Sequence, residues 1–209
     1  MKSVIIIISL VMNVFVAYGQ LKEGYFQYNI ELQAIEDSPE ARQTIAMLRN
    51  SKMEMYFVPY KTRLNFIMGQ FSNTSVIVDR KNNVTLSLSD SFFGKQAILT
   101  DKVEDTQVQN QDIKKSNNRK VILGYNCYQV EVTTPEGDKS DYWLTDEIKI
   151  DKESQRILNH NLPGFPVQFS KVENGVEMIF QLTNIKKKVE NPDEVFSVEV
   201  PDGYEIVKQ

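Results

Sequence analysis

The residues able to do chemistry are sparse in this chain, and their spacing does not predict catalysis. The sequence holds one histidine, His160, and one cysteine, Cys127. Neither a histidine-based triad nor a zinc site of several histidines can therefore form within one chain. Carboxylate pairs such as Asp141 and Asp146 could in principle do acid–base work, but residues of this kind are typical of solvated turns. We expect a protein that is not an enzyme and that holds no metal or cofactor.

The first residues predict export. Met1-Lys2-Ser3 is a short, positively charged start, and the run from Val4 to Val16 is almost wholly apolar. Ala17-Tyr18-Gly19 places small residues two apart, which is the spacing read by signal peptidase. The apolar run of about 13 residues is too short for a membrane-spanning helix, which needs about 20. We therefore expect residues 1–19 to be a signal peptide cleaved before Gln20, and the protein to be periplasmic without an integral membrane segment.

Composition limits the class of the remaining chain, 20–209. A length of about 190 residues is enough for one domain to bury a core without disulfides, and a lone Cys127 is predicted to be a buried small hydrophobe. The formal net charge of the whole sequence is −4. Because phosphate contacts dominate binding to nucleic acids, an acidic chain is not expected to bind them.

Alternation of apolar and polar residues recurs along the chain and predicts strands with one wet face, which belong to antiparallel sheets. The alternating runs are Phe26–Leu32, Met53–Phe57, Leu64–Met68, Val84–Leu88, Tyr128–Val132, Met178–Leu182 and Phe196–Val200. Turn signals at 81–83, 135–138 and 173–175 join neighbouring runs at hairpin spacing. We expect a mainly β single domain of about nine to eleven strands.

Few helices are expected. Ser38 is a cap residue, Pro39 and Glu40 suit the first turn, and apolar residues from Ala41 to Leu48 recur at helical spacing. A second, weaker helix or loop is expected between Thr145 and Leu158. The polar segment Asp101–Lys120 has no periodicity and predicts a surface loop.

A long antiparallel sheet has a wide apolar face that one or two helices cannot cover, so it must close, fold over or stay open around a cavity. An apolar cavity in such a sheet is a common site for small apolar ligands. The alternative, which the sequence supports equally well, is that side chains fill the interior completely. The predicted cavity lining comprises Phe57, Leu64, Phe66, Val78, Leu86, Leu88, Trp143 and Phe180.

Four motifs in order give a resemblance to a known family. They are Ile122-Leu123-Gly124-Tyr125-Asn126-Cys127, Tyr142-Trp143-Leu144-Thr145-Asp146-Glu147-Ile148, Asn161-Leu162-Pro163-Gly164-Phe165-Pro166, and Phe196 followed by Val200-Pro201-Asp202-Gly203-Tyr204. Together they resemble the DUF4412 family of exported proteins, common in Bacteroidetes. The resemblance runs from about Gly24 to Val207, with its specific motifs after Ile122.

The resemblance implies a fold similar to LolA and LppX: an antiparallel sheet curled into an unclosed barrel, with one or two short helices plugging the open side. Relatives with that fold carry lipoproteins or lipids, or sense envelope stress. A lipoprotein carrier of this kind would place an arginine in its cavity. Arg63 is the candidate here on a predicted strand, and it falls on the polar face.

Two functions are open at this point. The first is a non-enzymatic periplasmic protein that binds or carries an apolar ligand, such as a lipid or the acyl chain of a lipoprotein. The second is an envelope protein-interaction or sensor module, in which side chains fill the barrel and a protein is the partner. An apolar void in the structure would favour the first over the second.

Overall fold

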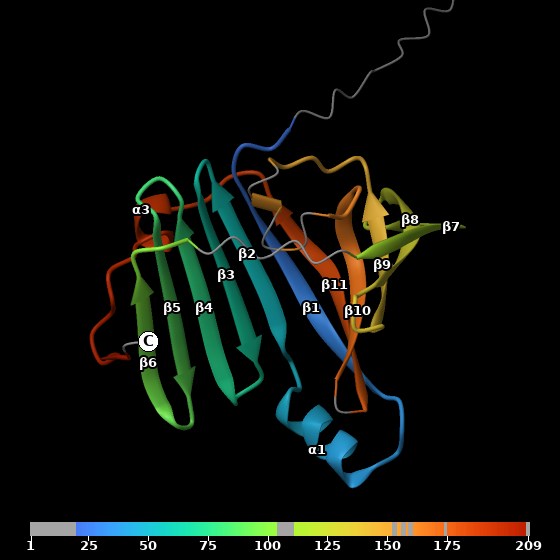
Figure 1. Cartoon of the computed structure of the whole chain (residues 1–209), viewed down its shortest axis with the longest axis horizontal. Coiled ribbons are helices and arrows are strands. Elements are labelled where there is room, and N and C mark those ends of the chain that lie inside the picture. The colour runs from blue at the N-terminus through green and yellow to red at the C-terminus, as the bar shows by residue number, and fades with distance from the viewer. Residues whose placement is uncertain are drawn as a thin grey trace, which may run out of the picture.

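The computed structural model describes residues 20–103, 111–151, 154–155, 158, 161–173 and 175–207. The predicted signal peptide and His160 lie outside these residues. The described chain forms one twelve-stranded sheet with short helices (Figure 1). The strands are β1 Gly24–Ala34, β2 Lys52–Val58, β3 Lys61–Met68, β4 Ser72–Asp79, β5 Val84–Ser91, β6 Gly94–Thr100, β7 Asp112–Ile122, β8 Tyr125–Thr133, β9 Lys139–Thr145, β10 Phe165–Glu173, β11 Val176–Lys186 and β12 Glu205–Ile206.

The sheet consists of two meanders joined at its centre. The strand order is β12-β6-β5-β4-β3-β2-β1-β11-β10-β9-β8-β7, so strands from the two ends of the chain, β1 and β11, are neighbours. All pairs are antiparallel except that of β12 with β6. The sheet ends at β7 and β12 and is not closed into a barrel, which confirms the predicted fold class.

The predicted first helix is confirmed as α1, Pro39–Met47. The backbone N–H of Ala41 donates to Oγ of Ser38 at 3.0 Å, so the serine satisfies one of the free donors at the helix start. The helix links β1 to β2 at the lower end of the sheet (Figure 1). In the predicted second helical region, Ser154, Gln155 and Leu158 are helical. A further short helix, α3, spans Pro192–Val195.

Two predictions of secondary structure are wrong. Much of the predicted loop Asp101–Lys120 is strand β7, which has β8 as its single neighbour. An edge strand buries few side chains, and lysines on it discourage pairing with a further strand. For these two reasons the sequence of β7 shows no regular alternation of apolar and polar residues. Phe196–Val200 was predicted as a strand, but it forms no ladder; only Glu205–Ile206 pairs, with β6.

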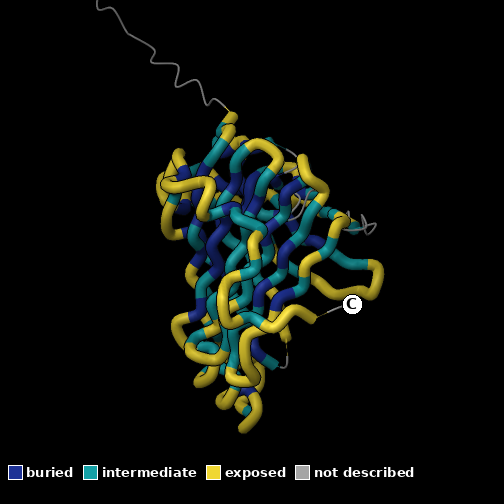
Figure 2. Tube along the Cα trace, turned by 90° about the vertical axis from the view of Figure 1, so that its left-hand side faces the viewer, coloured by how far each residue is buried: buried dark blue, intermediate teal, exposed yellow. Residues whose placement is uncertain are grey.

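Both faces of the sheet bury apolar residues. We call the face that bears Phe26 and Tyr28 the inner face, and the face that bears Tyr25 the outer face. The larger core cluster is centred on the inner face of β1 and β2. A second cluster lies on the outer face of β4 to β6, where Val198, Val200 and Tyr204 cover Ile77, Leu86, Leu88 and Ala97. The alternation at Phe196–Val200 thus serves packing onto a sheet. Figure 2 shows the buried residues along the middle of the sheet, with exposed turns at its lower end.

Candidate functional site

Strand register builds an apolar stripe across the inner face. Ile30 pairs with Phe180, Phe180 with Phe169, and Phe169 with Tyr142, which joins β1, β11, β10 and β9. On the other side of β1, Met53 of β2 pairs with Phe66 of β3. Directly paired residues share a face, so side chains from six strands meet on one surface.

This stripe lines an apolar groove of about 690 Å³. Its floor is aromatic: the ring of Phe169 stacks on those of Phe180 and Tyr142, with centroids 4.6 Å and 5.4 Å apart. The apolar lining is Ile30, Leu32, Leu48, Met53, Leu64, Phe66, Met68, Tyr142, Leu158, Phe169, Val172, Met178 and Phe180. The volume falls within the range of about 300–1,000 Å³ that is usual for small-molecule sites.

The groove opens at the lower end of the sheet. Its rim includes Leu48, which follows α1, and the ends of the β8–β9 hairpin loop at Thr134 and Asp138. The upper end is occupied by the core. There Phe26 contacts Phe165 with ring centroids 4.6 Å apart, and Ile148 and Ile150 from the β9–β10 connection join the same cluster. The result is a groove with one closed end.

Three of the eight predicted lining residues, Leu64, Phe66 and Phe180, line this groove. Phe57 is fully buried in the core above it. Trp143 packs against the same core, and Nζ of Lys120 lies 4.1 Å from the centroid of its ring. These five residues therefore belong to one apolar body, with three of them at its open part.

The remaining predicted residues lie elsewhere. Val78 pairs with Thr62 and does not reach the groove. The expectation that Leu86 and Leu88 share a surface with Leu64 is wrong: the register pairs Leu86 with Ile77, which places both leucines on the outer face under the C-terminal segment. An alternating pattern shows that a strand has one apolar face, but it does not show which face of the sheet that is.

Several groove residues were absent from the predicted lining. Ile30 and Met53 alternate with polar neighbours, and Met178 lies two residues before Phe180, so these three carried the same signal as the residues that were chosen. Tyr142 and Phe169 were harder to assign, because the β9–β10 register shifts between Pro166 and Gln168. Such a bulge breaks the strict period of two.

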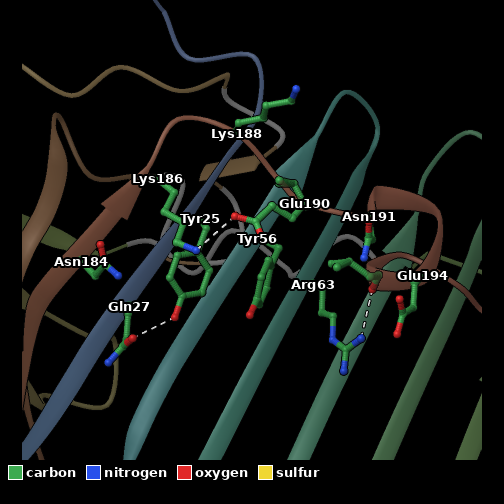
Figure 3. Close-up of a pocket in the computed structure, with 12 residues that line it drawn as sticks. Tyr25, Gln27, Tyr56, Arg63, Asn184, Lys186, Lys188, Glu190, Asn191 and Glu194 are labelled. Atoms are coloured by element: carbon green, nitrogen blue, oxygen red, sulfur yellow. Dashed lines mark hydrogen bonds and ion pairs between the residues drawn. The ribbon is translucent and has the colours of Figure 1, made fainter.

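A polar pocket of about 560 Å³ lies on the outer face, between the sheet and the segment that carries α3 (Figure 3). Its floor includes Tyr25, Tyr56 and Arg63, and its wall includes Glu190, which pairs with Lys186 at 3.5 Å. Nη1 of Arg63 donates to the carbonyl oxygen of Val195 at 3.1 Å. Arg63 thus holds the C-terminal segment on the outer face, as predicted for a residue of the polar face, and is not in the groove.

Beside this pocket is a buried carboxylate, Glu54. It accepts hydrogen bonds from Lys52 (2.7 Å), from Asn65 (3.2 Å) and from the hydroxyls of Tyr25 (3.3 Å) and Tyr56 (3.4 Å). Burial acts to raise the pKa of Glu54, but the hydrogen bonds and the charge of Lys52 outweigh it and lower the pKa below its ordinary value of 4.5. The network joins β1, β2 and β3.

Glu54 should contribute a pH-dependent part of the stability. Because its folded pKa is lowered, the stabilisation is present at neutral pH and is lost as the pH falls below 4.5 toward the folded pKa. We therefore expect the free energy of unfolding of the wild type to approach that of Glu54→Gln as the pH falls through this range. Urea unfolding at a series of pH values measures the difference. Glu136→Gln, at an exposed turn position, is the control; a pH-independent gap for Glu54→Gln would contradict this role.

Among the described residues, the other reactive groups form no second site. Cys127 is buried, as predicted, and burial raises the pKa of its thiol. Within the described ranges, no cluster of three or more histidine, cysteine, aspartate or glutamate side chains is arranged to hold a metal ion. None of the described helices has both the length and the apolar character needed to cross a bilayer.

Solved structures of similar fold are known. The chain is similar to an uncharacterized conserved protein from Thermus thermophilus, with a TM-score of 0.51 at 10% identity over 90% of this chain and 92% of that one. It also matches PNGF-II, with a TM-score of 0.49 at 16% identity, over 90% of this chain but 31% of the PNGF-II chain, and so spans less than a third of it. A LolA superfamily protein from Nitrosomonas europaea matches over 85% of this chain and 90% of its own, at 10% identity and a TM-score of 0.36. Of these three, only the Thermus protein has a TM-score above 0.5, so only that likeness supports the fold. At these sequence identities none of the three supports a function.

Comparison with curated proteins found no match. The family comparison is decisive, because the model described as "Domain of unknown function (DUF4412)" matches residues 26–204. This range takes in all but the first two residues of β1 and everything up to the start of β12. The chain belongs to the DUF4412 family.

Proposed function

We propose that this protein binds an apolar chain, such as a lipid or the acyl chain of a lipoprotein, in the inner-face groove and catalyses no reaction. The observation that carries the proposal is the groove itself: about 690 Å³ of space, lined mainly by apolar side chains and open at one end. A barrel filled by side chains would lack such a space, so the groove favours a small ligand over a purely structural interior. We infer from the predicted signal peptide that this activity takes place in the periplasm.

The groove suits an amphiphile with its apolar part inside. Burial of a hydrocarbon chain contributes about 0.8 kcal/mol per CH₂ group, and the aromatic floor offers continuous contact for it. The rim is polar and includes Thr134, Ser140, Lys139 and Lys171. Lys139 forms an ion pair with Glu131 at 3.0 Å, and Lys171 forms one with Glu173 at 2.9 Å. We therefore place the polar headgroup of the ligand at the rim, in contact with water.

Phe66→Glu should lower the affinity for a fluorescent fatty acid about tenfold or more, because it puts a charge where the ligand needs an apolar wall. The wild type, purified from the periplasmic fraction, is titrated with the probe, and lipids extracted from it are identified by mass spectrometry. The intact mass shows whether the mature chain begins at Gln20. We expect the wild type to bind the probe saturably and to carry a co-purified lipid.

Ile67→Glu is the matched control. Ile67 is the next residue of β3, is also half-buried, and lies on the outer face. It should retain the wild-type affinity, provided that thermal unfolding shows both variants to be folded. Clean lipid extracts together with no saturable binding would refute the proposal, and equal losses in the two variants would remove the groove as the site.

A further inference from the structure

The turn between β5 and β6 carries two unusually exposed aromatic residues. Phe92 is 90% exposed and Phe93 is 83% exposed, and their rings touch edge to face with centroids 6.1 Å apart. The turn is tight, since Ser91 pairs with Gly94 and only the two phenylalanines connect them. Gly94, which ends the turn, has a φ of +114°, a conformation that glycine adopts readily. Tight turns are usually formed by polar residues or glycine, so the turn geometry does not explain two phenylalanines.

Further apolar side chains lie next to this turn. The β3–β4 turn is at the same end of the sheet, and Ser72 of β4 pairs with Ser91 of β5. Phe71 and Phe92 therefore occupy adjacent positions, one step beyond that pair. Phe71 is 39% exposed and Met68 is 37% exposed. We call Met68, Phe71, Phe92 and Phe93 the apolar tip.

The apolar tip is continuous with the mouth of the groove. Met68 belongs to both, since it lines the groove and is part of the tip. Figure 1 shows the β3–β4 and β5–β6 turns and α1 at the same lower end of the sheet. Any surface that covers the tip would thus face the opening through which an apolar ligand enters.

The shape and charge of the tip favour a lipid surface over a protein. Its two phenylalanines project from a hairpin end, and such a wedge fits between mobile lipids more readily than into a fixed protein surface. The charges that flank the β5–β6 turn compensate each other, because Lys95 pairs with Asp90 at 3.2 Å. The chain is acidic overall, with a formal net charge of −4, so anionic headgroups would repel it. Uncharged or zwitterionic headgroups with accessible acyl chains remain as the matching partner.

We propose that the apolar tip inserts into the interfacial layer of a zwitterionic lipid bilayer, with Phe92 and Phe93 as its anchors. Apolar groups that enter the interfacial layer of a membrane bind with a strength that follows the apolar area they bury. The inference extends the proposed function, because it brings the mouth of the groove to a lipid source. It does not depend on what the groove holds.

The test is co-sedimentation of the full mature chain with phosphatidylcholine vesicles. We expect the wild type to bind, with little change between low and high salt, and the Phe92→Ser/Phe93→Ser double variant to lose on the order of tenfold or more in vesicle partitioning. The double variant should fold normally, because both side chains are almost fully exposed. Tyr60→Ser is the matched control: Tyr60 is a 66% exposed aromatic residue in the β2–β3 turn, at the other end of the strands. It should bind vesicles like the wild type.

Three results would overturn the inference. The first is absence of vesicle binding by the wild type, and the second is an equal loss in the Tyr60 variant. The third is concentration-dependent self-association that the double variant abolishes while vesicle binding stays unchanged, since the tip would then be a contact between copies of the chain. The fatty-acid titration separates this inference from the proposed function: a double variant that keeps its fatty-acid affinity but not its vesicle binding supports both, and vesicle binding without fatty-acid binding supports the tip alone.

Discussion

Phe57→Ala should lower the free energy of unfolding by about 3–5 kcal/mol, the range for truncating a fully buried aromatic residue. Phe57 has no exposed surface, and its ring is stacked on that of Phe26 with centroids 5.6 Å apart. Gly24 lies directly opposite it, and a Cβ there would be 2.8 Å from the ring. The ring of Phe26 and the backbone of Gly24 border the cavity that the truncation would leave. Urea unfolding at neutral pH measures the loss.

The same variant separates a structural role from a binding role. Phe57 was predicted to line a ligand cavity, but the structure places it in the core above the groove. We therefore expect the folded fraction of Phe57→Ala to bind the fluorescent fatty acid with an affinity close to that of the wild type. A large loss of affinity with unchanged stability would show instead that Phe57 lines the ligand-binding groove.

Gly69→Ala should destabilise the protein by about 2–5 kcal/mol. Gly69 has φ of +56°, a conformation that costs a residue with a side chain about 1–2 kcal/mol. A Cβ would also lie 2.5 Å from the carbonyl oxygen of Met47 and 2.9 Å from that of Arg49. Both oxygens belong to backbone at the end of α1, and displacing such neighbours costs about 1–3 kcal/mol more. Thermal and urea unfolding measure the sum.

Gly175→Ala is the control for this substitution. Gly175 also has a positive φ, +72°, but a Cβ there would meet nothing within 4 Å. Gly175→Ala should therefore lose only the stability that the positive φ costs a residue with a side chain, about 1–2 kcal/mol. If the two variants were equally stable, the close contact between the β3–β4 turn and the end of α1 would contribute nothing to the fold.

Local patterns were enough to predict most of the sheet. The strict alternation in β2 and β5 and the turn residues at 81–83 and 135–138 identify hairpins correctly, because the signals lie within a few residues of each other. The cap at Ser38 likewise predicts α1. These features depend on backbone preferences that neighbouring residues determine.

Long-range packing was beyond such patterns. Leu86 and Leu88 are buried because Val198 and Val200, more than a hundred residues later, cover the outer face. Three residues of the predicted lining, Leu64, Phe66 and Phe180, lie in the groove, but the extent of the groove depends on the pairing of β1 with β11, which no local signal specifies. Sequence patterns therefore predict that apolar faces exist, and the register decides which of them meet.

Packing explains the glycine in the Leu-Pro-Gly motif of the resemblance. In the Leu-Pro-Gly turn, a Cβ at Gly164 would be 2.6 Å from the hydroxyl of Tyr128 and 3.2 Å from a carboxylate oxygen of Asp146. That hydroxyl donates to Asp146 at 3.0 Å, and burial together with this bond raises the pKa of Tyr128 to about 12. The glycine thus makes room for a hydrogen bond between Tyr128, which directly follows the first motif, and Asp146 of the second motif.

The central pairing of β1 with β11 has a consequence for how the chain matures. While the chain folds, β1 can find β2 early, but its other side stays an unprotected edge until residues 176–186 pair with it. Contacts so distant along the chain form slowly, and an open edge can recruit strands from other incompletely folded chains. A chaperone that shields the early meander would therefore improve the yield, and any premature stop before β11 should produce aggregates.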